Sequence, residues 1–279
     1  MIKFEHSIFA LPFALTGALL AFKEVNATVP FALGKVAWIV LAMIGARSAA
    51  MAFNRILDAE IDGRNPRTRM RHIPAGLLSV RFAWTFVAVA IGVFLIAAWA
   101  LNPLCLELAP VALGVVFAYS YTKKFTSLSH LVLGLSLGIA PAAAWIAVTG
   151  ALDLRILWLT AAVAFWTAGF DIIYSCQDYE FDRAEGLFSV PRTWGIGGAL
   201  RVSRVLHVLM TACLGALAWS FGLGWLSVFG IAAIVTLLLY EHSLVKPNDL
   251  SRVNAAFFTV NGYVSVIFLL FWAADICRY

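Results

Sequence analysis

Residues 36–62 have the sequence VAWIVLAMIGARSAAMAFNRILDAEID, an apolar run that ends in an acidic segment. Asn54, Asp58 and Asp62 are spaced four residues apart. In a helix, which turns by about 100° per residue, they therefore lie along one face. The apolar run is long enough to cross a membrane, and its acidic end would meet water. This stretch predicts a transmembrane helix that carries a stripe of oxygen ligands where it leaves the bilayer.

A second acidic stretch follows another apolar run. Residues 171–182 have the sequence DIIYSCQDYEFD, in which Asp171, Asp178 and Asp182 are separated by seven and four residues. This spacing again gives one helical stripe. The two stretches form a weak internal repeat in which both helices run in the same direction. Such a parallel repeat differs from the inverted repeats of many secondary transporters.

The composition indicates a polytopic membrane protein. Apolar residues make up 62% of the 279 and charged residues only 13%, whereas a soluble domain has about 45–50% and about 25%. We expect an all-α helical bundle around a central site open to the cytoplasmic side, and no linker divides the single domain 1–279. About nine transmembrane helices are predicted, at residues 7–22, 36–55, 82–101, 108–122, 131–149, 154–175, 199–221, 224–240 and 256–274. The first is interpreted as a retained span and not a cleaved signal peptide.

Lysine and arginine predict the orientation. Fifteen of the 20 fall on the side of the N-terminus, four fall on the other side, and Arg47 lies inside a span. The positive-inside rule then places the N-terminus and both acidic stretches in the cytoplasm, in a multi-pass protein of the inner (cytoplasmic) membrane. The basic pI of about 9.2 therefore reflects topology and phosphate binding. Nothing in the sequence indicates a nucleic-acid or protein partner.

An alternative interpretation of the acidic stripes is that they are ordinary helix ends exposed to water, without a binding role. Two observations count against it: charge is scarce in this chain yet gathers at these two places, and Asp171 follows the run WTAGF. Asp171 is therefore predicted to lie below the membrane interface, where an unpaired acid costs roughly 2.5–3.5 kcal/mol.

Carboxylate and amide oxygens at two facing helix ends suit Mg²⁺, which takes oxygen ligands together with phosphate oxygens. Arginine and lysine nearby suit the phosphates themselves. A diphosphate held in this way is a good leaving group, because its developing charge is neutralised in place. An allylic polyprenyl diphosphate would fit this setting, with its lipid-like tail among the helices and its headgroup at the acidic stripes.

The two stripes, Asn54-x-x-x-Asp58-x-x-x-Asp62 and Asp171-x-x-Tyr174-x-x-x-Asp178-x-x-x-Asp182, resemble the signature motifs of the UbiA-type intramembrane prenyltransferase superfamily. Residues 71–76 (RHIPAG) and 119–124 (YSYTKK) resemble two further segments of that superfamily. The similarity spans essentially the whole chain and is greatest to 4-hydroxybenzoate polyprenyltransferases and related menaquinone-pathway enzymes. Arg55 is a departure, because many members have Asp there.

The resemblance implies a role for each matching residue. Mg²⁺ and the diphosphate would be held by Asn54, Asp58, Asp62, Asp178 and Asp182. The phosphates would contact Arg71 and Lys123, with Lys124 and Arg192 as further substrate-binding candidates. Asp171 and Tyr174 would lie nearer the aromatic acceptor. Arg64, Arg67 and Arg69 would either join the basic clamp or serve only to orient the chain in the membrane.

Arg47 lies seven residues before Asn54, on the same helical face and inside the membrane. A buried arginine requires an anionic partner, which here would be Asp171 or a carboxylate of the acceptor. We count Arg47 among the catalytic candidates with Asp171 and Tyr174. A purely structural ion pair remains the alternative.

The sequence thus predicts Mg²⁺-dependent transfer of a polyprenyl group to an aromatic acceptor, foremost 4-hydroxybenzoate, in quinone biosynthesis. Another acceptor is a second possibility: a dihydroxynaphthoate of menaquinone synthesis, a tetrapyrrole or a glycerol phosphate. A cation-coupled transporter that uses the same acids is the rival from a different class. A structural membrane subunit would not need the paired stripes.

Overall fold

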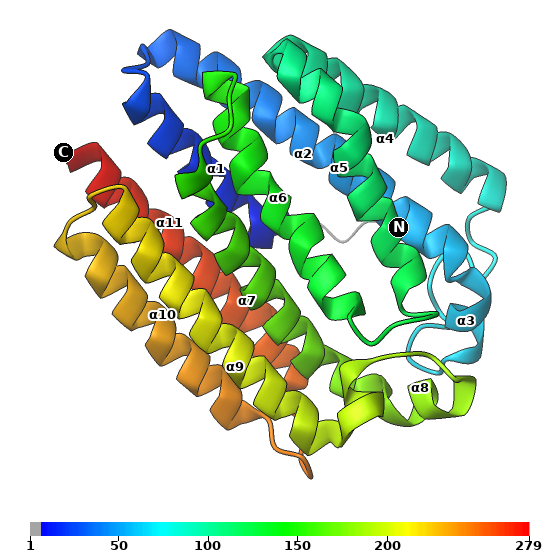
Figure 1. Cartoon of the computed structure of the whole chain (residues 1–279). Coiled ribbons are helices and arrows are strands. Elements are labelled where there is room, and N and C mark those ends of the chain that lie inside the picture. Colours follow the sequence, from blue (N-terminus) through cyan, green and yellow to red (C-terminus); the bar gives the residue numbers. More distant parts are fainter. Residues whose placement is uncertain (1–6, 279) are drawn as a thin grey trace.

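The computed structural model describes residues 7–278 and consists of helices packed roughly side by side (Figure 1). No strand occurs in that part of the chain, so the expected all-α architecture is confirmed. The long helices are α1 (Ser7–Glu24), α2 (Val29–Leu57), α4 (Val80–Leu101), α5 (Pro103–Thr122), α6 (Ser129–Thr149), α7 (Leu157–Ser175), α9 (Val190–Ser220), α10 (Trp225–Leu244) and α11 (Asn261–Arg278).

Eight helices in residues 7–278 are long and apolar enough to cross a membrane, which makes the chain a multi-pass membrane protein. The predicted span at residues 7–22 corresponds to α1, which is not among these eight, and the total of nine stays a prediction. The expectations for the very start of the chain, including the cytoplasmic N-terminus, fall on residues 1–6 and lie outside the described residues.

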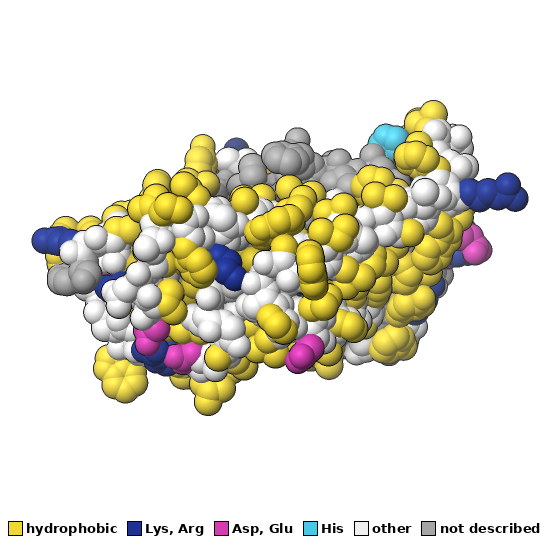
Figure 2. All heavy atoms as spheres, turned by 90° about the horizontal axis from the view of Figure 1, so that it is seen from above, with side chains coloured by type: hydrophobic (Ala, Val, Ile, Leu, Met, Phe, Trp, Pro, Cys, Tyr) yellow, Lys and Arg dark blue, Asp and Glu magenta, His cyan; other side chains and the backbone are white. Residues whose placement is uncertain are grey.

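The lipid-facing surface explains the high apolar content. Figure 2 shows hydrophobic side chains over most of the visible face and few charged ones. Trp99 and Trp219, for example, are 71% and 86% exposed. Burial from water cannot drive helices together inside a lipid bilayer, so close packing must contribute instead. The interior holds large aromatic side chains such as Phe13, Trp166 and Phe268.

Glycines allow the closest helix contacts. Gly134 and Gly138 lie one turn apart on α6 and face the backbone of α7 at Ala164 and Thr160. A Cβ atom on Gly138 would lie 2.6 Å from the carbonyl oxygen of Thr160, which leaves no room for a side chain. These contacts fix the register of α6 against α7, and with it the side chains near the N-terminal end of α6 and the C-terminal end of α7.

The two acidic stretches do not form the continuous helices that their spacing predicted. The first helix breaks at Asp58, which ends α2 and precedes the short α3 (Ala59–Arg64). The second breaks after Ser175, where a 3₁₀ turn (Cys176–Asp178) leads into α8 (Tyr179–Glu185). Both short helices lie at the same end of the bundle (Figure 1). The acids therefore lie where the chain turns and not along two continuous helices.

Helix α9 begins at Val190, nine residues before the predicted start at 199. Ser189 caps it by accepting a hydrogen bond from the backbone N–H of Arg192, and Pro191 occupies the first turn. Gly195 then interrupts the helix with φ of 66°, a left-handed conformation that glycine adopts readily. The polar, glycine-rich sequence 192–198 therefore forms a kinked first part of a helix instead of a loop.

Candidate active site

Asp58 is buried where α2 meets α3 and is only 2% exposed. One of its oxygens, Oδ2, accepts a hydrogen bond from the side-chain amide of Asn54 at 3.0 Å and lies 2.6 Å from Lys123 Nζ. Lys123 immediately follows α5, so this ion pair joins two loops that are distant in sequence. The other oxygen, Oδ1, is buried and has no hydrogen-bond partner in residues 7–278.

Asp62, one turn later on α3, is also buried. Arg71 donates from Nη1 to both carboxylate oxygens at 2.7 Å, and Arg55 Nη1 lies 3.7 Å from Oδ2. The hydroxyl of Thr68 donates to the backbone carbonyl of Asp62 at 3.0 Å, which holds the loop over α3. Arg55, the residue that departs from the superfamily pattern, thus contributes positive charge beside the acids.

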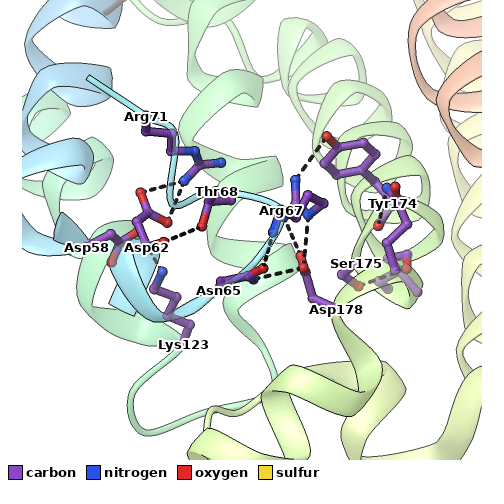
Figure 3. A network of polar contacts seen from close by, with 12 residues as sticks. Asp58, Asp62, Asn65, Arg67, Thr68, Arg71, Lys123, Tyr174, Ser175 and Asp178 are labelled. Carbon is purple, nitrogen blue, oxygen red and sulfur yellow. Dashed lines mark hydrogen bonds and ion pairs between the residues drawn. The ribbon is translucent and has the colours of Figure 1, made fainter. Parts of the chain in front are cut away.

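Asp178 carries the corresponding contacts on the second acidic stretch (Figure 3). Arg67 makes a two-pronged ion pair with it, from Nε to Oδ1 at 2.9 Å and from Nη2 to Oδ2 at 2.5 Å. Asn65 donates to Oδ1 at 3.2 Å, and Arg67 also donates to the hydroxyl of Tyr174 at 3.3 Å. Burial acts most strongly and lowers the pKa of Arg67, but the hydrogen bond to Asp178 and the charges of Asp178, Tyr174 and Asp62 together outweigh it, so the pKa is raised.

The loop after α3 therefore connects the two acidic stretches. In Figure 3, Asn65 and Arg67 lie between the pair formed by Asp58 and Asp62 and the side chain of Asp178. The sequence left the role of Arg67 open between clamp and orientation, and it gave no signal for Asn65. A second link is the ion pair at 3.0 Å between Arg64 of α3 and Glu185 of α8.

The remaining predicted residues at this end of the bundle are less closely joined to Asp58, Asp62 and Asp178. Asp182 is buried on α8 and lies within electrostatic range of Asp178 and Lys123. Lys124 is exposed. The guanidinium of Arg192 donates to the backbone carbonyl of Leu187 at 2.7 Å, so it orders the start of α9 in this structure instead of contacting an acid.

A mostly apolar cavity of about 420 Å³ lies beneath the acids, between α1, α2, α5, α6 and α7. Its lining includes Arg47, Asn54, Tyr119, Asp171 and Tyr174. Phe257 closes one wall from a π-helical turn (Ala255–Val260) that precedes α11, and its ring lies 4.1 Å from that of Tyr174. Asp58, Asp62 and Asp178 with their basic partners form a charged cluster. The cavity thus joins this charged cluster to apolar space inside the bundle.

Asp171 and Arg47 both line this cavity, but no hydrogen bond or ion pair joins them in the described part of the chain. Asp171 Oδ2 instead lies 2.6 Å from Nδ1 of His130, the second residue of α6. The Nε atom of Arg47 is buried and has no hydrogen-bond partner in residues 7–278. Of the two anions expected for Arg47, Asp171 is therefore engaged elsewhere. The sequence interpretation missed His130 because only helix packing brings it to Asp171.

The carboxylates do not form a preformed metal cage. Within the described residues, no three His, Cys, Asp or Glu side chains gather closely enough to hold a metal by themselves. Three of the acids are instead each neutralised by arginine or lysine. The donor set still fits Mg²⁺ that arrives with phosphate, because Mg²⁺ needs few protein carboxylates in such sites. The unpartnered buried oxygen of Asp58 is one available ligand.

The fold and the site define an intramembrane protein with a charged cluster above an apolar cavity, as a lipid diphosphate requires. The chain belongs to the UbiA prenyltransferase family, whose model matches residues 10–273. It is accordingly a prenyltransferase and not the cation-coupled transporter that the acids alone left possible.

Several curated relatives are named 4-hydroxybenzoate octaprenyltransferase. The one from Vibrio atlanticus is 29% identical over 84% of this chain and 83% of its own length. The one from Vibrio campbellii is 29% identical over 90% of both chains. Among solved structures, the apo UbiA homologue of Aeropyrum pernix K1 covers 99% of both chains with 33% identity and a TM-score of 0.87. A UbiA homologue of Archaeoglobus fulgidus, solved with DMAPP and Mg²⁺, is 21% identical over 98% of this chain and 96% of its own, with a TM-score of 0.73.

Proposed function

We propose that this prenyltransferase moves a polyprenyl group from an allylic polyprenyl diphosphate to 4-hydroxybenzoate. One observation carries the proposal: a single cavity has the basic and acidic cluster at its rim and, within it, Arg47, whose buried Nε has no hydrogen-bond partner among residues 7–278. The first feature suits a diphosphate and the second suits a carboxylated acceptor. The names of the curated relatives support the same pair of substrates.

At the rim, the diphosphate would be bound by Arg67, Arg71 and Lys123, whose charged groups already point into the cluster. Mg²⁺, when bound, would neutralise diphosphate charge and so favour its departure. The residues that we propose to hold it are Asn54, Asp58, Asp62, Asp178 and Asp182. A UbiA homologue of Archaeoglobus fulgidus that shares this fold was solved with DMAPP and Mg²⁺ together, which supports joint binding of a prenyl diphosphate and the metal.

Deeper in the cavity, Arg47 would bind the acceptor carboxylate and Asp171 would accept a hydrogen bond from its hydroxyl. The ring carbon next to the hydroxyl would then bond to the allylic carbon as the diphosphate leaves. A base or water would take the displaced ring proton. Tyr174 and Phe257 form an aromatic wall against which the acceptor ring can stack.

We further propose that the charged cluster faces the cytoplasm and that the protein resides in the inner membrane. The segments around α3 and α8 carry both acidic stretches together with Arg64, Arg67, Arg69, Arg71 and Arg183. The positive-inside rule supports a cytoplasmic position for such loops. Cytoplasmic access would suit a water-soluble acceptor, while the prenyl tail remains among the membrane helices.

Purified protein in lipid nanodiscs, supplied with Mg²⁺ and a radiolabelled prenyl diphosphate, tests the proposal directly. We expect label transfer to 4-hydroxybenzoate in preference to an uncarboxylated phenol or a glycerol phosphate. A dihydroxynaphthoate belongs in the same panel, because Arg47 fits its carboxylate equally well. Preference for the naphthoate would replace the acceptor and keep the reaction. Failure with every aromatic acceptor would contradict the proposed function.

A further inference from the structure

We propose that His130 is a positioning residue that holds the carboxylate of Asp171 toward the acceptor and leaves Arg47 free to bind the acceptor carboxylate. This inference rests on the proposed function, because it concerns the acceptor end of the same cavity. Its starting point is the short contact of 2.6 Å between His130 Nδ1 and Asp171 Oδ2. The His130 side chain is 6% exposed and that of Asp171 is 18% exposed.

The hydrogen bonds of His130 define which nitrogen carries the proton. The backbone N–H of Val190, at the start of α9, points at Nε2 with a distance of 3.4 Å. Nε2 must therefore accept, so in the neutral ring the hydrogen lies on Nδ1 and is donated to Asp171. His130 thus contacts both a backbone donor and a carboxylate acceptor, which fixes its ring orientation.

Backbone packing brings His130 to this place. His130, Gly134 and Gly138 are spaced four residues apart and share one face of α6. The two glycines touch the backbone of α7 at Ala164 and Thr160. The next position toward the cytoplasmic end is His130, and Asp171 lies seven residues beyond Ala164, on the same face of α7. The glycine contacts therefore determine the position of the histidine relative to the acid.

The contact has a consequence for the charges inside the cavity. A carboxylate and a guanidinium that line one cavity of this size would attract each other strongly, because water screens them poorly there. The hydrogen bond from His130 occupies one oxygen of Asp171 and holds the carboxylate on the α6 side. Arg47 Nε keeps no hydrogen-bond partner in the described part of the chain. The acceptor can then meet a separated anion and cation, which match its hydroxyl and its carboxylate.

Two substitutions separate positioning from other roles. His130→Asn keeps a donor near the place of Nδ1 but cannot exchange protons near neutral pH, whereas His130→Leu removes the donor. We expect His130→Leu to raise the acceptor KM or lower kcat by about tenfold, the effect of one lost hydrogen bond to a charged group. His130→Asn should recover most of this loss. The KM for prenyl diphosphate should stay within about twofold in both. His207→Asn, at a buried histidine of α9 that pairs with His242, is the matched control.

Equal loss in the Asn and Leu variants would overturn the inference, because a hydrogen-bond donor alone would then be insufficient. So would an unchanged acceptor KM and kcat in His130→Leu, or a rise in the diphosphate KM as large as that for the acceptor. If His130→Leu does not fold, the Asn variant decides, and a tenfold rise in its acceptor KM contradicts the role. Wild-type protein without transfer to any aromatic acceptor would instead contradict the proposed function.

Discussion

Arg47 is an arginine in the membrane-spanning part of α2, and the buried Nε of its guanidinium has no hydrogen-bond partner in the described part of the chain. Charged groups in such positions are costly and usually mark a substrate or ion pathway. Asp171, the anionic side chain expected as the partner of Arg47, contacts His130 instead. An acceptor carboxylate is the partner that we propose for it.

Replacement of Arg47 by lysine tests this assignment. Arg47→Lys keeps the positive charge but loses the planar fork that binds a carboxylate through two hydrogen bonds. We expect the KM for the carboxylated acceptor to rise about tenfold or more, while the KM for prenyl diphosphate changes little. Steady-state kinetics with each substrate varied in turn measures both. Arg252→Lys, at an exposed position after α10, is the control, and an unchanged acceptor KM would remove Arg47 from the acceptor site.

Asp58 and Asp178 test the diphosphate end. Asp58→Ala and Asp178→Ala should each lower turnover by at least about a hundredfold, because each removes a proposed ligand of the Mg²⁺ that neutralises the leaving diphosphate. Each also leaves its cation, Lys123 or Arg67, without its acid. Folding should be checked by size-exclusion chromatography. Glu60→Ala is the matched control, because Glu60 lies on α3 with its side chain 89% exposed. Near-normal turnover in either Asp variant would contradict that residue's role.

Removal of divalent cations should stop prenyl transfer. In their absence the diphosphate would face the carboxylates of both acidic stretches with only the basic side chains to balance its charge. Activity is measured after exhaustive EDTA treatment and again after Mg²⁺ or Mn²⁺ is restored. Full activity in EDTA would contradict a metal requirement.

Among single residues, the sequence drew attention to those with the most regular spacing. The acids of both stretches were found from helical spacing, and Lys123 and Arg71 were found from resemblance. Asn65, Thr68 and His130 were missed, because each contributes through a contact made by loop shape or helix packing. No spacing within the chain encodes the contact between His130 on α6 and Asp171 on α7.

Among the elements, the pair α6 and α7 has the most direct influence on the acceptor end of the cavity. Their backbones touch at Gly134 and Gly138, so even a methyl group there meets backbone atoms of α7. Backbone cannot move aside as a flexible side chain can. Helix separation is therefore the expected response to a larger residue.

Gly134→Ala should destabilise the folded protein by about 1–3 kcal/mol, the usual cost of overpacking. It should also weaken the acceptor end more than the diphosphate end, because it shifts His130 relative to Asp171. Thermal unfolding in detergent and the KM of each substrate measure the two effects. Gly114→Ala on α5 is the control, since a Cβ there meets nothing within 4 Å. If both variants behave alike, the close approach of α6 and α7 has no such role.

The helices were predicted well in their apolar parts and less well at their ends. Hydrophobic runs located all the long helices, because a membrane requires long apolar segments. The breaks at Asp58 and after Ser175 were not predicted. The acids keep a helical spacing along the sequence across a short bend, so the spacing does not reveal the bend. The start of α9 was missed for a different reason. Its glycines and polar residues resemble a loop, and the capping by Ser189 is visible only in the structure.

For the whole molecule, the distribution of arginine and lysine predicts the orientation in the membrane. We expect a cysteine at position 246, in the α10–α11 loop, to react with a membrane-impermeant reagent from the cytoplasmic side. A cysteine at position 223, in the turn between α9 and α10, should react from the opposite side. Lys246→Cys and Leu223→Cys are compared in a Cys277→Ser background, because Cys277 is exposed. The reverse pattern would invert the topology and remove cytoplasmic access to the charged cluster.

The ion pairs of the charged cluster have a thermodynamic consequence. Asp58, Asp62 and Asp178 are each compensated by a basic side chain. A metal ion alone must therefore compete with these cations for the acids, and a diphosphate alone must compete with the acids for the cations. When the two ligands arrive together, both sets of charges find new partners. The protein should consequently show positive heterotropic linkage, with Mg²⁺ binding at least about tenfold tighter in the presence of an unreactive prenyl diphosphate analogue. Calorimetric titration would measure this coupling, and independent binding of the two ligands would show that the ion pairs are no barrier. With such coupling, the enzyme would seldom hold metal without a substrate to use it on.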